Sequence, residues 1–540
     1  MAGDVVTSAL IIGSGPAAAA AALALSRRED LKITVIDVGL QLETERQQLV
    51  DVLASSEQCH WDAAAVDSVS QGPVDSKTRG VPEKRLYGSD YPFRNVGQLD
   101  GVTAAADATT SVISAAYGGF STVWGSQLMP FTASTFESWP MSAAVIRPHY
   151  EAILSQIPFA GEEDDLASSF PLMGQPAPLP QLSPRSRWVL DAHERHRLVL
   201  KGRGITIGKA RLAFDAANCV RCGLCMTGCP YGLIYSAAHT FDVLSRSGRV
   251  THHSGFLVLK IAEEADRALV SAKEIATGRM QQFEADRVYV ACGAIGTTRL
   301  VANSLGLLDV ELSMLESQQF VLPMMSLRGT PDPRQEPDFT LNQFNMIVAL
   351  DEDSLDISQL HFYTFNSAFA DALPSLLRGH VTEQARMQLL RRLTVAFGYL
   401  PSWRSPRLLV RARPNSNGGS LPDLHISRDT APPGRNRMLR TVLTRLVRSA
   451  RLLDLYPVLP MLQLAAGGKS YHWGGSFPHA SDGSAASGTL ASDRLGRVGS
   501  WRRIHIVDAS VFPSVPAMTF TLTVMANAHR IASETLELTS

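Results

Sequence analysis

Cysteine, aromatic side chains and net charge are all scarce in this chain of 540 residues. Six residues are cysteine, 7% are aromatic, and the formal net charge is −1. Because the chain carries almost no net charge, no global field steers it toward nucleic acid or an anionic membrane. Six thiols, four of which stand in one run, do not match the disulfide framework of a small secreted protein.

Long hydrophobic runs are missing as well. Apolar stretches such as 455–466 are short or are broken by proline or a polar residue, so the sequence predicts no transmembrane helix. The first apolar run begins within a few residues and has no basic segment before it, so we expect no signal peptide. A cytoplasmic location fits these features and the reduced thiols best.

The composition is that of an ordinary globular protein, with 45% hydrophobic and 19% charged residues. A length of 540 residues predicts two or more domains, or one large domain with a substrate-binding half. We find no internal repeats and no low-complexity linker in the sequence.

A strand, a glycine turn, a helix and a second strand follow one another at the N-terminus. Residues 9–12 and 32–37 are typical of buried parallel strands, and residues 17–26 are typical of a helix. In the G-x-G-x-x-A turn, the first glycine permits a tight turn, the second lets the backbone approach a pyrophosphate, and the alanine lets the helix pack closely. An acid that ends the second strand can accept from ribose hydroxyls. The residues of this predicted dinucleotide site are Gly13, Gly15, Pro16, Ala18 and Asp37.

Pro16, directly after the second glycine, is more typical of FAD-binding than of NAD-binding turns, and four later segments support FAD. They are "AAYGGFSTVWGSQLMPFTASTFESWPMS" (115–142), "ADRVYVACGAIGTTRLVANSLG" (285–306), "YHWGGSFPHA" (471–480) and "RIHIVDASVFPSVPAMTFTLTVMANAHRIA" (503–532). In this order they make the chain resemble the glucose–methanol–choline (GMC) flavoprotein oxidoreductases, most specifically in the last segment. The chain is also similar to a bacterial branch of that superfamily linked to sugar and polysaccharide metabolism.

The resemblance implies an FAD that lies across the N-terminal unit, with its isoalloxazine at the border of a second domain. Two glycines and an acid match the positions that bind the ADP moiety, a glycine loop matches the segment beside the flavin, and a D-A-S turn matches the segment that closes on the cofactor. These three sets are Gly13, Gly15 and Asp37; Gly118, Gly119 and Ser121; and Asp508 and Ala509.

His472, in "SYHWGG", matches the family's catalytic position. The residue there takes the hydroxyl proton of the substrate while hydride leaves the same carbon for flavin N5. An imidazole, with an ordinary pKa of ~6.5, suits that role near neutral pH. The family usually has a second His or Asn shortly before the last helix, where this chain has Thr519. Threonine can orient a substrate hydroxyl but is no base, so His472 acts alone or a base comes from elsewhere. The nearby histidines His479, His505 and His529 are weaker candidates.

Four of the six cysteines lie in "CVRCGLCMTGCPYGLIYS", from Cys219 to Ser236. The spacing C-x2-C-x2-C-x3-C-P is that of a bacterial ferredoxin and predicts an iron–sulfur cluster on Cys219, Cys222, Cys225 and Cys229. Either all four hold one 4Fe–4S cluster, or three hold a 3Fe–4S cluster or an open iron site, because the last cysteine of such a run can bind elsewhere. A metal-free structural loop is the alternative, and zinc suits so compact a run poorly.

Some GMC members with a cluster in this region are cytochrome-linked sugar dehydrogenases. A cluster passes electrons singly, so it can empty a two-electron flavin into a one-electron acceptor protein. We therefore expect an FAD-dependent dehydrogenase that oxidises the CH–OH group of a sugar, polyol or sugar-like natural product. Two alternatives stay open: an FAD oxidase that uses O2 and has a structural cysteine loop, and a non-catalytic electron-transfer subunit.

The expected fold is α/β, with a Rossmann-like FAD-binding domain and a mainly antiparallel-sheet substrate-binding domain. The first domain comprises 1–130, 205–310 and 465–540, and the second 131–204 and 311–464. In the second, 341–350 and 358–365 predict strands that roof the active site. Residues 434–453 predict an amphipathic basic helix, which is either a solvated face or a dock for an anionic substrate or partner.

Overall fold

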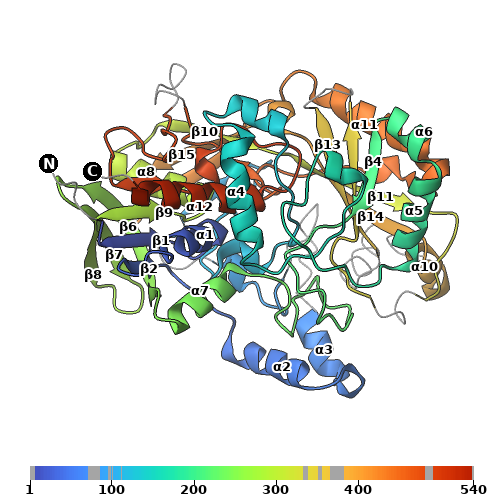
Figure 1. Ribbon diagram of the computed structural model, residues 1–540, viewed down its shortest axis with the longest axis horizontal. Coiled ribbons are helices and arrows are strands. Elements are labelled where there is room, and N and C mark those ends of the chain that lie inside the picture. The colour runs from blue at the N-terminus through green and yellow to red at the C-terminus, as the bar shows by residue number, and fades with distance from the viewer. Residues whose placement is uncertain are drawn as a thin grey trace.

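A computed structural model describes residues 6–70, 85–94, 99, 101–110, 112–332, 338–350, 356–364, 382–480 and 490–537. The strands of these segments form four sheets. A parallel sheet and a seven-stranded antiparallel sheet lie in the two halves of the molecule (Figure 1).

The parallel sheet has the strand order β20-β9-β1-β2-β5, and all four of its pairings are parallel. Its strands are β1 (Ser8–Ile12), β2 (Lys32–Ile36), β5 (Thr251–His253), β9 (Arg287–Val290) and β20 (Ile504–Ile506). Residues 9–12 of the central strand β1 are all buried. Continuous burial is expected for a parallel strand whose two faces are both covered.

Helices close together in Figure 1 cover this sheet. Helix α1 (Pro16–Leu25) packs against α12 (Thr521–Glu537) and α7 (Ala237–Arg246), and α12 packs against α4 (Ala143–Leu154). Helix α1 contains seven alanines in ten residues, and its alanines are buried. Such small side chains let α12 and the sheet approach the α1 backbone closely, so the two ends of the chain share one core.

The antiparallel sheet has the order β17-β11-β14-β13-β12-β4, and β18 pairs with β11 beside β17. Its strands are β4 (Ile205–Lys209), β11 (Gln319–Met325), β12 (Phe344–Ala349), β13 (Ile357–Tyr363), β14 (Leu393–Tyr399), β17 (Tyr456–Pro457) and β18 (Gln463–Leu464). The two predicted strands are present as β12 and β13, and Phe365 lies outside the described residues. The predicted basic helix is present as α11 (Arg435–Leu453), whose apolar side joins the core of this sheet through Met438, Val442 and Leu446.

Two further sheets and several helices complete the described fold. One sheet has the order β19-β10-β15-β16-β3 and the other β6-β7-β8. Their strands are β3 (Val102–Ala104), β6 (Phe256–Glu263), β7 (Ala268–Glu274), β8 (Met280–Ala285), β10 (Glu311–Glu316), β15 (Leu408–Arg413), β16 (Asp423–Arg428) and β19 (Trp473–Gly474). The other helices are α2 (Thr44–Ser55), α3 (Ala63–Ser70), α5 (Pro184–Arg195), α6 (Arg197–Gly202), α8 (Ala294–Leu305) and α10 (Glu383–Leu390).

The predicted mixed α/β fold, with a parallel Rossmann-like sheet and a mainly antiparallel sheet, is confirmed. The predicted domain boundaries stay a prediction. Within the described segments, no helix has the length and apolar character needed to span a membrane.

Candidate active site

A cavity of about 450 Å³ is lined by residues of both halves of the chain. Its wall includes the glycine turn after β1, the end of β2, the glycine loop, the turn before η9 (Ala509–Val511) and strands of the antiparallel sheet. The predicted site residues on this wall are Gly13, Gly15, Pro16, Asp37, Gly119, Ser121, His472, Asp508, Ala509 and Thr519. Ala18 is instead fully buried in α1, and Gly118 lies directly before the wall residue Gly119.

The glycine turn packs tightly at its first glycine and is open at its second. Gly13 has a φ of 105°, and a Cβ there would lie 2.4 Å from the Ala291 carbonyl oxygen, so only glycine fits. A Cβ on Gly15 would meet no atom within 4 Å, so space is open in front of the N-terminus of α1. Backbone N–H groups at a helix N-terminus favour an anion in such a space.

One carboxylate oxygen of Asp37 lies within hydrogen-bond distance of a histidine, and the other has no hydrogen-bond partner among the described residues. Its Oδ1 lies 2.8 Å from Nε2 of His252, whose ring stacks on Tyr117. Its Oδ2 is buried and has no hydrogen-bond partner among the described residues. A buried oxygen without a partner beside the glycine turn can accept a hydrogen bond from a hydroxyl of a bound ribose.

The glycine loop packs directly on the glycine turn. The Gly118 N–H donates to Ser14 Oγ over 3.0 Å, and a Cβ on Gly119 would lie 3.3 Å from the Gly15 Cα. Ser121 Oγ donates to the Gly118 carbonyl and accepts from the Ala237 N–H at the start of α7. The loop is therefore held between the turn and α7, close to any group bound at the turn.

Asp508 joins the last strand of the parallel sheet to the N-terminus of α8. Its carboxylate accepts from the hydroxyls of Thr297 and Ser510 and from the Ser510 N–H. Burial raises the pKa of this carboxyl, and the hydrogen bonds oppose that shift. The Ala509 carbonyl accepts from the Gly475 N–H, so this turn also fixes the segment that follows His472.

His472 is held in place by rings and by its own backbone. Its ring stacks on Tyr399 with centroids 4.6 Å apart and meets the edge of Phe520 at 5.0 Å. Its carbonyl accepts from the Ser317 N–H, and its N–H donates to Ser470 Oγ. Burial lowers the pKa of His472 to about 3, so the imidazole is neutral near pH 7 and able to accept a proton. Its Nδ1 is enclosed without a partner in the described structure, which leaves Nε2 for the cavity.

Glu316, at the end of β10, supports the turn that carries His472. Its Oε1 accepts from the Gly468 N–H and from Ser470 Oγ, each over 2.9 Å. Burial raises the pKa of this carboxyl to about 7, against the opposing effect of these hydrogen bonds. Glu316 does not line the cavity, so it acts on the site by positioning the 468–472 turn.

Thr519 and a second histidine face the same cavity. Thr519 Oγ1 is buried and has no partner in the described part of the chain. His361, on β13, is 3% exposed and also lines the cavity. Sequence reasoning missed it because the candidate histidines were sought near the C-terminus. The sequence pattern that could have indicated it lies in β13. There Gln359, His361 and Tyr363 alternate with apolar residues, so they share one face of the strand.

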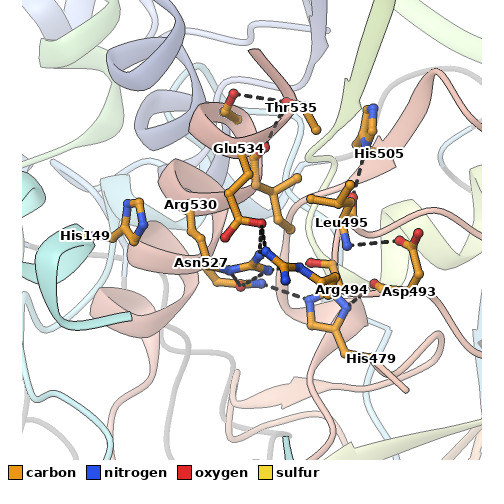
Figure 2. Close-up of polar contacts among 12 residues, drawn as sticks. His149, His479, Asp493, Arg494, Leu495, His505, Asn527, Arg530, Glu534 and Thr535 are labelled. Carbon is orange, nitrogen blue, oxygen red and sulfur yellow. Dashed lines mark hydrogen bonds and ion pairs between the residues drawn. The ribbon is translucent and has the colours of Figure 1, made fainter. Parts of the chain in front are cut away.

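The other C-terminal histidines have structural roles. In Figure 2, His479 lies between Asp493 and Asn527, with Nδ1 2.6 Å from the Asp493 carbonyl oxygen and Nε2 3.3 Å from the Asn527 amide nitrogen. His505 Nδ1 lies 3.0 Å from the Leu495 carbonyl oxygen. His529 pairs with His149 across α12 and α4 over 2.8 Å. None of these three histidines is among the described residues that line the cavity.

The four cysteines of the run form no disulfide, and Cys225 and Cys229 are buried. Backbone N–H groups point at their sulfurs: the Arg221 N–H donates to Cys219 Sγ and the Thr340 N–H to Cys225 Sγ, each over 3.4 Å. Hydrogen bonds from residues 231–234 lower the pKa of Cys229 against the larger, raising effect of burial. N–H groups gathered around sulfur are typical of iron–sulfur sites.

Burial and mutual repulsion make this loop unfavourable for thiolates without a cation. Burial raises the pKa of Cys219 to about 11 and that of Cys222 to about 12, and Cys225 and Cys229 add to both shifts. Thiolates in this loop therefore need a cationic centre beside them.

The sulfurs of the run do not all converge on one point. Within the described segments, no three cysteine sulfurs of the run lie within 4.8 Å of one another. A single zinc at ~2.3 Å from four sulfurs would need them about 3.8 Å apart. In an iron–sulfur cluster each thiolate binds a different iron, so the four sulfurs need not meet at one point.

The cysteine loop contacts the cavity wall on two sides. Trp124 lines the cavity and donates from Nε1 to the Tyr235 carbonyl over 2.7 Å. Met226, between Cys225 and Cys229, packs against the cluster of Tyr363, Phe397 and Tyr399, whose tyrosines also line the cavity. The loop therefore lies one layer of side chains from the cavity.

Comparison with solved structures gives matches over nearly the whole chain. A pyridoxine 4-oxidase from Mesorbium loti is 14% identical, with a TM-score of 0.58, over 98% of this chain and 99% of that chain. A formate oxidase variant from Aspergillus oryzae RIB40, in a study of FAD modification, is 12% identical with a TM-score of 0.60, over 99% of both chains. Both neighbours are GMC-family flavoenzymes. The chain has the GMC oxidoreductase fold.

The cysteine loop has a match of its own on this GMC fold. The family described as 4Fe-4S binding domain (Fer4_6) matches residues 212–234, which include all four cysteines of the run. Comparison with curated proteins finds no match.

Proposed function

We propose that this protein is an FAD-dependent oxidoreductase that oxidises the CH–OH group of a sugar, polyol or sugar-like molecule. A single observation carries the proposal: one cavity joins an FAD-type glycine turn to a half-buried, neutral imidazole at His472. The GMC fold of the whole chain supports the same reading.

Residues on the cavity wall would hold FAD at its two ends. The α1 N-terminus and Gly15 would receive the pyrophosphate, Asp37 Oδ2 a ribose hydroxyl, and the Gly119 and Ala509 segments would flank the rest. When bound, FAD supplies a two-electron acceptor for hydride.

His472 supplies the proton acceptor for this reaction. A neutral imidazole in a buried cavity can take the substrate hydroxyl proton at Nε2, and the adjoining carbon then gives up its hydride. Tyr399 and Phe520 hold the ring on both sides and exclude water from it. Thr519 Oγ1, which faces the same cavity, can donate to or accept from a substrate hydroxyl.

An iron–sulfur cluster on Cys219, Cys222, Cys225 and Cys229 is the proposed electron exit. The donor set fits such a cluster, since the four cysteines form no disulfide and backbone N–H groups lie around their sulfurs. The 4Fe-4S family match over 212–234 supports the same assignment. A cluster supplies one-electron transfer, which suits a one-electron acceptor protein as the physiological oxidant.

A second candidate function is an FAD oxidase that reduces O2, with the cysteine loop in a structural role. The names of the two solved neighbours, both oxidases, favour it. The two candidates differ only in the oxidative half of the reaction, so that half must be measured by itself.

The experiment is anaerobic mixing of the purified protein with a panel of D-glucose, glycerol, pyridoxine and benzyl alcohol. Loss of flavin absorbance by a sugar or polyol supports the proposal, and loss by none of the panel contradicts it. The reduced protein is then mixed with O2 or with cytochrome c. Faster reoxidation by cytochrome c supports the dehydrogenase, whereas faster reoxidation by O2 supports the oxidase.

A further inference from the structure

His361 is a second imidazole in the cavity, and the reaction as proposed so far makes no use of it. It comes from β13, far from His472 in sequence, and both rings line the same cavity. Burial lowers the pKa of His361 to about 3, and the nearby His472 lowers it further. The two imidazoles are therefore close enough to interact, and both are neutral near pH 7.

Tyr399 holds the two imidazoles in one arrangement. Its ring contacts that of His361 at a centroid distance of 5.2 Å and that of His472 at 4.6 Å. Gln319 donates to the Tyr399 hydroxyl over 2.9 Å, which fixes the tyrosine from the other side. Packing of this kind leaves both imidazoles little freedom to rotate.

Some polar side-chain atoms near the two histidines have no hydrogen-bond partner in the described structure. His361 Nε2 and Thr519 Oγ1, on two residues of the cavity wall, are buried without a partner among the described residues. A buried polar group without a hydrogen-bond partner is costly, so two of them on one cavity wall indicate a partner that the chain itself does not provide. A substrate with several hydroxyl groups would supply that partner.

We propose that His361 is the second catalytic imidazole, which donates a hydrogen bond to the substrate oxygen while His472 takes the hydroxyl proton. The inference rests on the proposed function. In this step the O–H bond breaks and its proton goes to His472. The C–H bond breaks with its electron pair, which leaves as hydride to bound FAD, and a C=O bond forms. His361 stabilises the negative charge that develops on the oxygen, a role that the site would otherwise leave to Thr519.

The variants His361→Phe and His361→Gln show whether the site needs the hydrogen-bond donor of His361 or only its ring. Phe keeps a ring against Tyr399 but has no donor, whereas Gln keeps an N–H donor. With the fastest sugar or polyol of the panel, we expect flavin reduction to slow by a hundredfold or more in the Phe variant, and about tenfold or less in the Gln variant. Equal rates in the two variants would overturn the proposal.

A second measurement tests the pairing of the two histidines without requiring catalytic turnover. Ring-15N histidine NMR of the FAD-loaded protein should show the His472 signals shifted in His361→Phe and unshifted in His505→Gln, a buried histidine outside the cavity wall. FAD affinity and melting temperature show whether each variant is folded. Unshifted His472 signals in a folded His361→Phe protein would overturn the pairing. If the wild type reduces its flavin with none of the panel, the proposed function fails and the NMR comparison alone decides on the pair.

Discussion

At the scale of single residues, the chemistry of the site depends on burial. His472 and His361 have ordinary side chains, and the apolar and aromatic walls around them keep both neutral at a pH where exposed histidine begins to titrate. A neutral imidazole can accept a proton or donate a hydrogen bond, and an imidazolium can only donate. The walls therefore decide which role each histidine can take.

His472→Ala should leave FAD bound and the fold intact but slow flavin reduction about a hundredfold or more, because the proton acceptor is lost. Thr519→Ala should slow it less, since a hydroxyl can only orient the substrate. Stopped-flow absorbance at a saturating concentration of the best panel substrate measures both variants. Near-normal flavin reduction in His472→Ala would show that His472 is not the base.

The role of Glu316 in the 468–472 turn can be tested through the pH dependence of stability. The pKa of its carboxyl is raised by burial from about 4.5 to about 7, so the folded protein holds this proton where the unfolded chain has lost it. Its contribution to stability therefore falls as the pH rises from about 4.5 to about 7, by on the order of 3 kcal/mol. Glu316→Gln, which can still accept from Gly468 and Ser470, should remove that fall. The measurement is the unfolding free energy at pH 5 and pH 8.

The matched control for Glu316→Gln is Glu311→Gln on the same strand, where the carboxylate is exposed and pairs with Arg411. We expect Glu311→Gln to keep the wild-type pH dependence. If Glu316→Gln keeps it too, the buried carboxyl is not the titrating group.

At the scale of elements, local patterns predicted more than long-range contacts. The strand, turn and helix at 9–26 and the helix at 434–453 follow from apolar periodicity and glycine placement, and the structure has them as β1, α1 and α11. His361 could not be placed in the site from the sequence, because its approach to His472 depends on how β13 packs against the 468–472 turn. Likewise, the support of Glu316 for that turn is a contact between residues about 150 positions apart.

Cys225→Ser tests the cysteine loop as an element. With the cluster as electron exit, reduction of the flavin by substrate should stay largely intact, and reoxidation by cytochrome c should slow at least about tenfold. Iron content should fall, and the loop should lose the stability that metal binding gives it. Cys59→Ser, an exposed thiol outside the run, is the matched control and should change neither half-reaction. Equal reoxidation rates in the two variants would exclude the cluster as the exit.

At the scale of the whole molecule, the fold places the cysteine loop next to the cavity. The cavity lies between the parallel and antiparallel halves, and the cysteine loop contacts its wall through Trp124 and Met226. In the proposed function, the cavity holds the two-electron flavin and the loop holds the one-electron cluster. The central claim is that this chain carries both cofactors together.

The most direct test of that claim is an anaerobic purification followed by an absorption spectrum and counts of FAD, iron and sulfide per chain. The account predicts one FAD with three or four irons and about as many sulfides, and broad cluster absorbance beneath the flavin bands. Air can strip a labile cluster, so the preparation must stay free of oxygen. A protein with full FAD, no iron and four free thiols at Cys219–Cys229 would contradict the account and favour the oxidase.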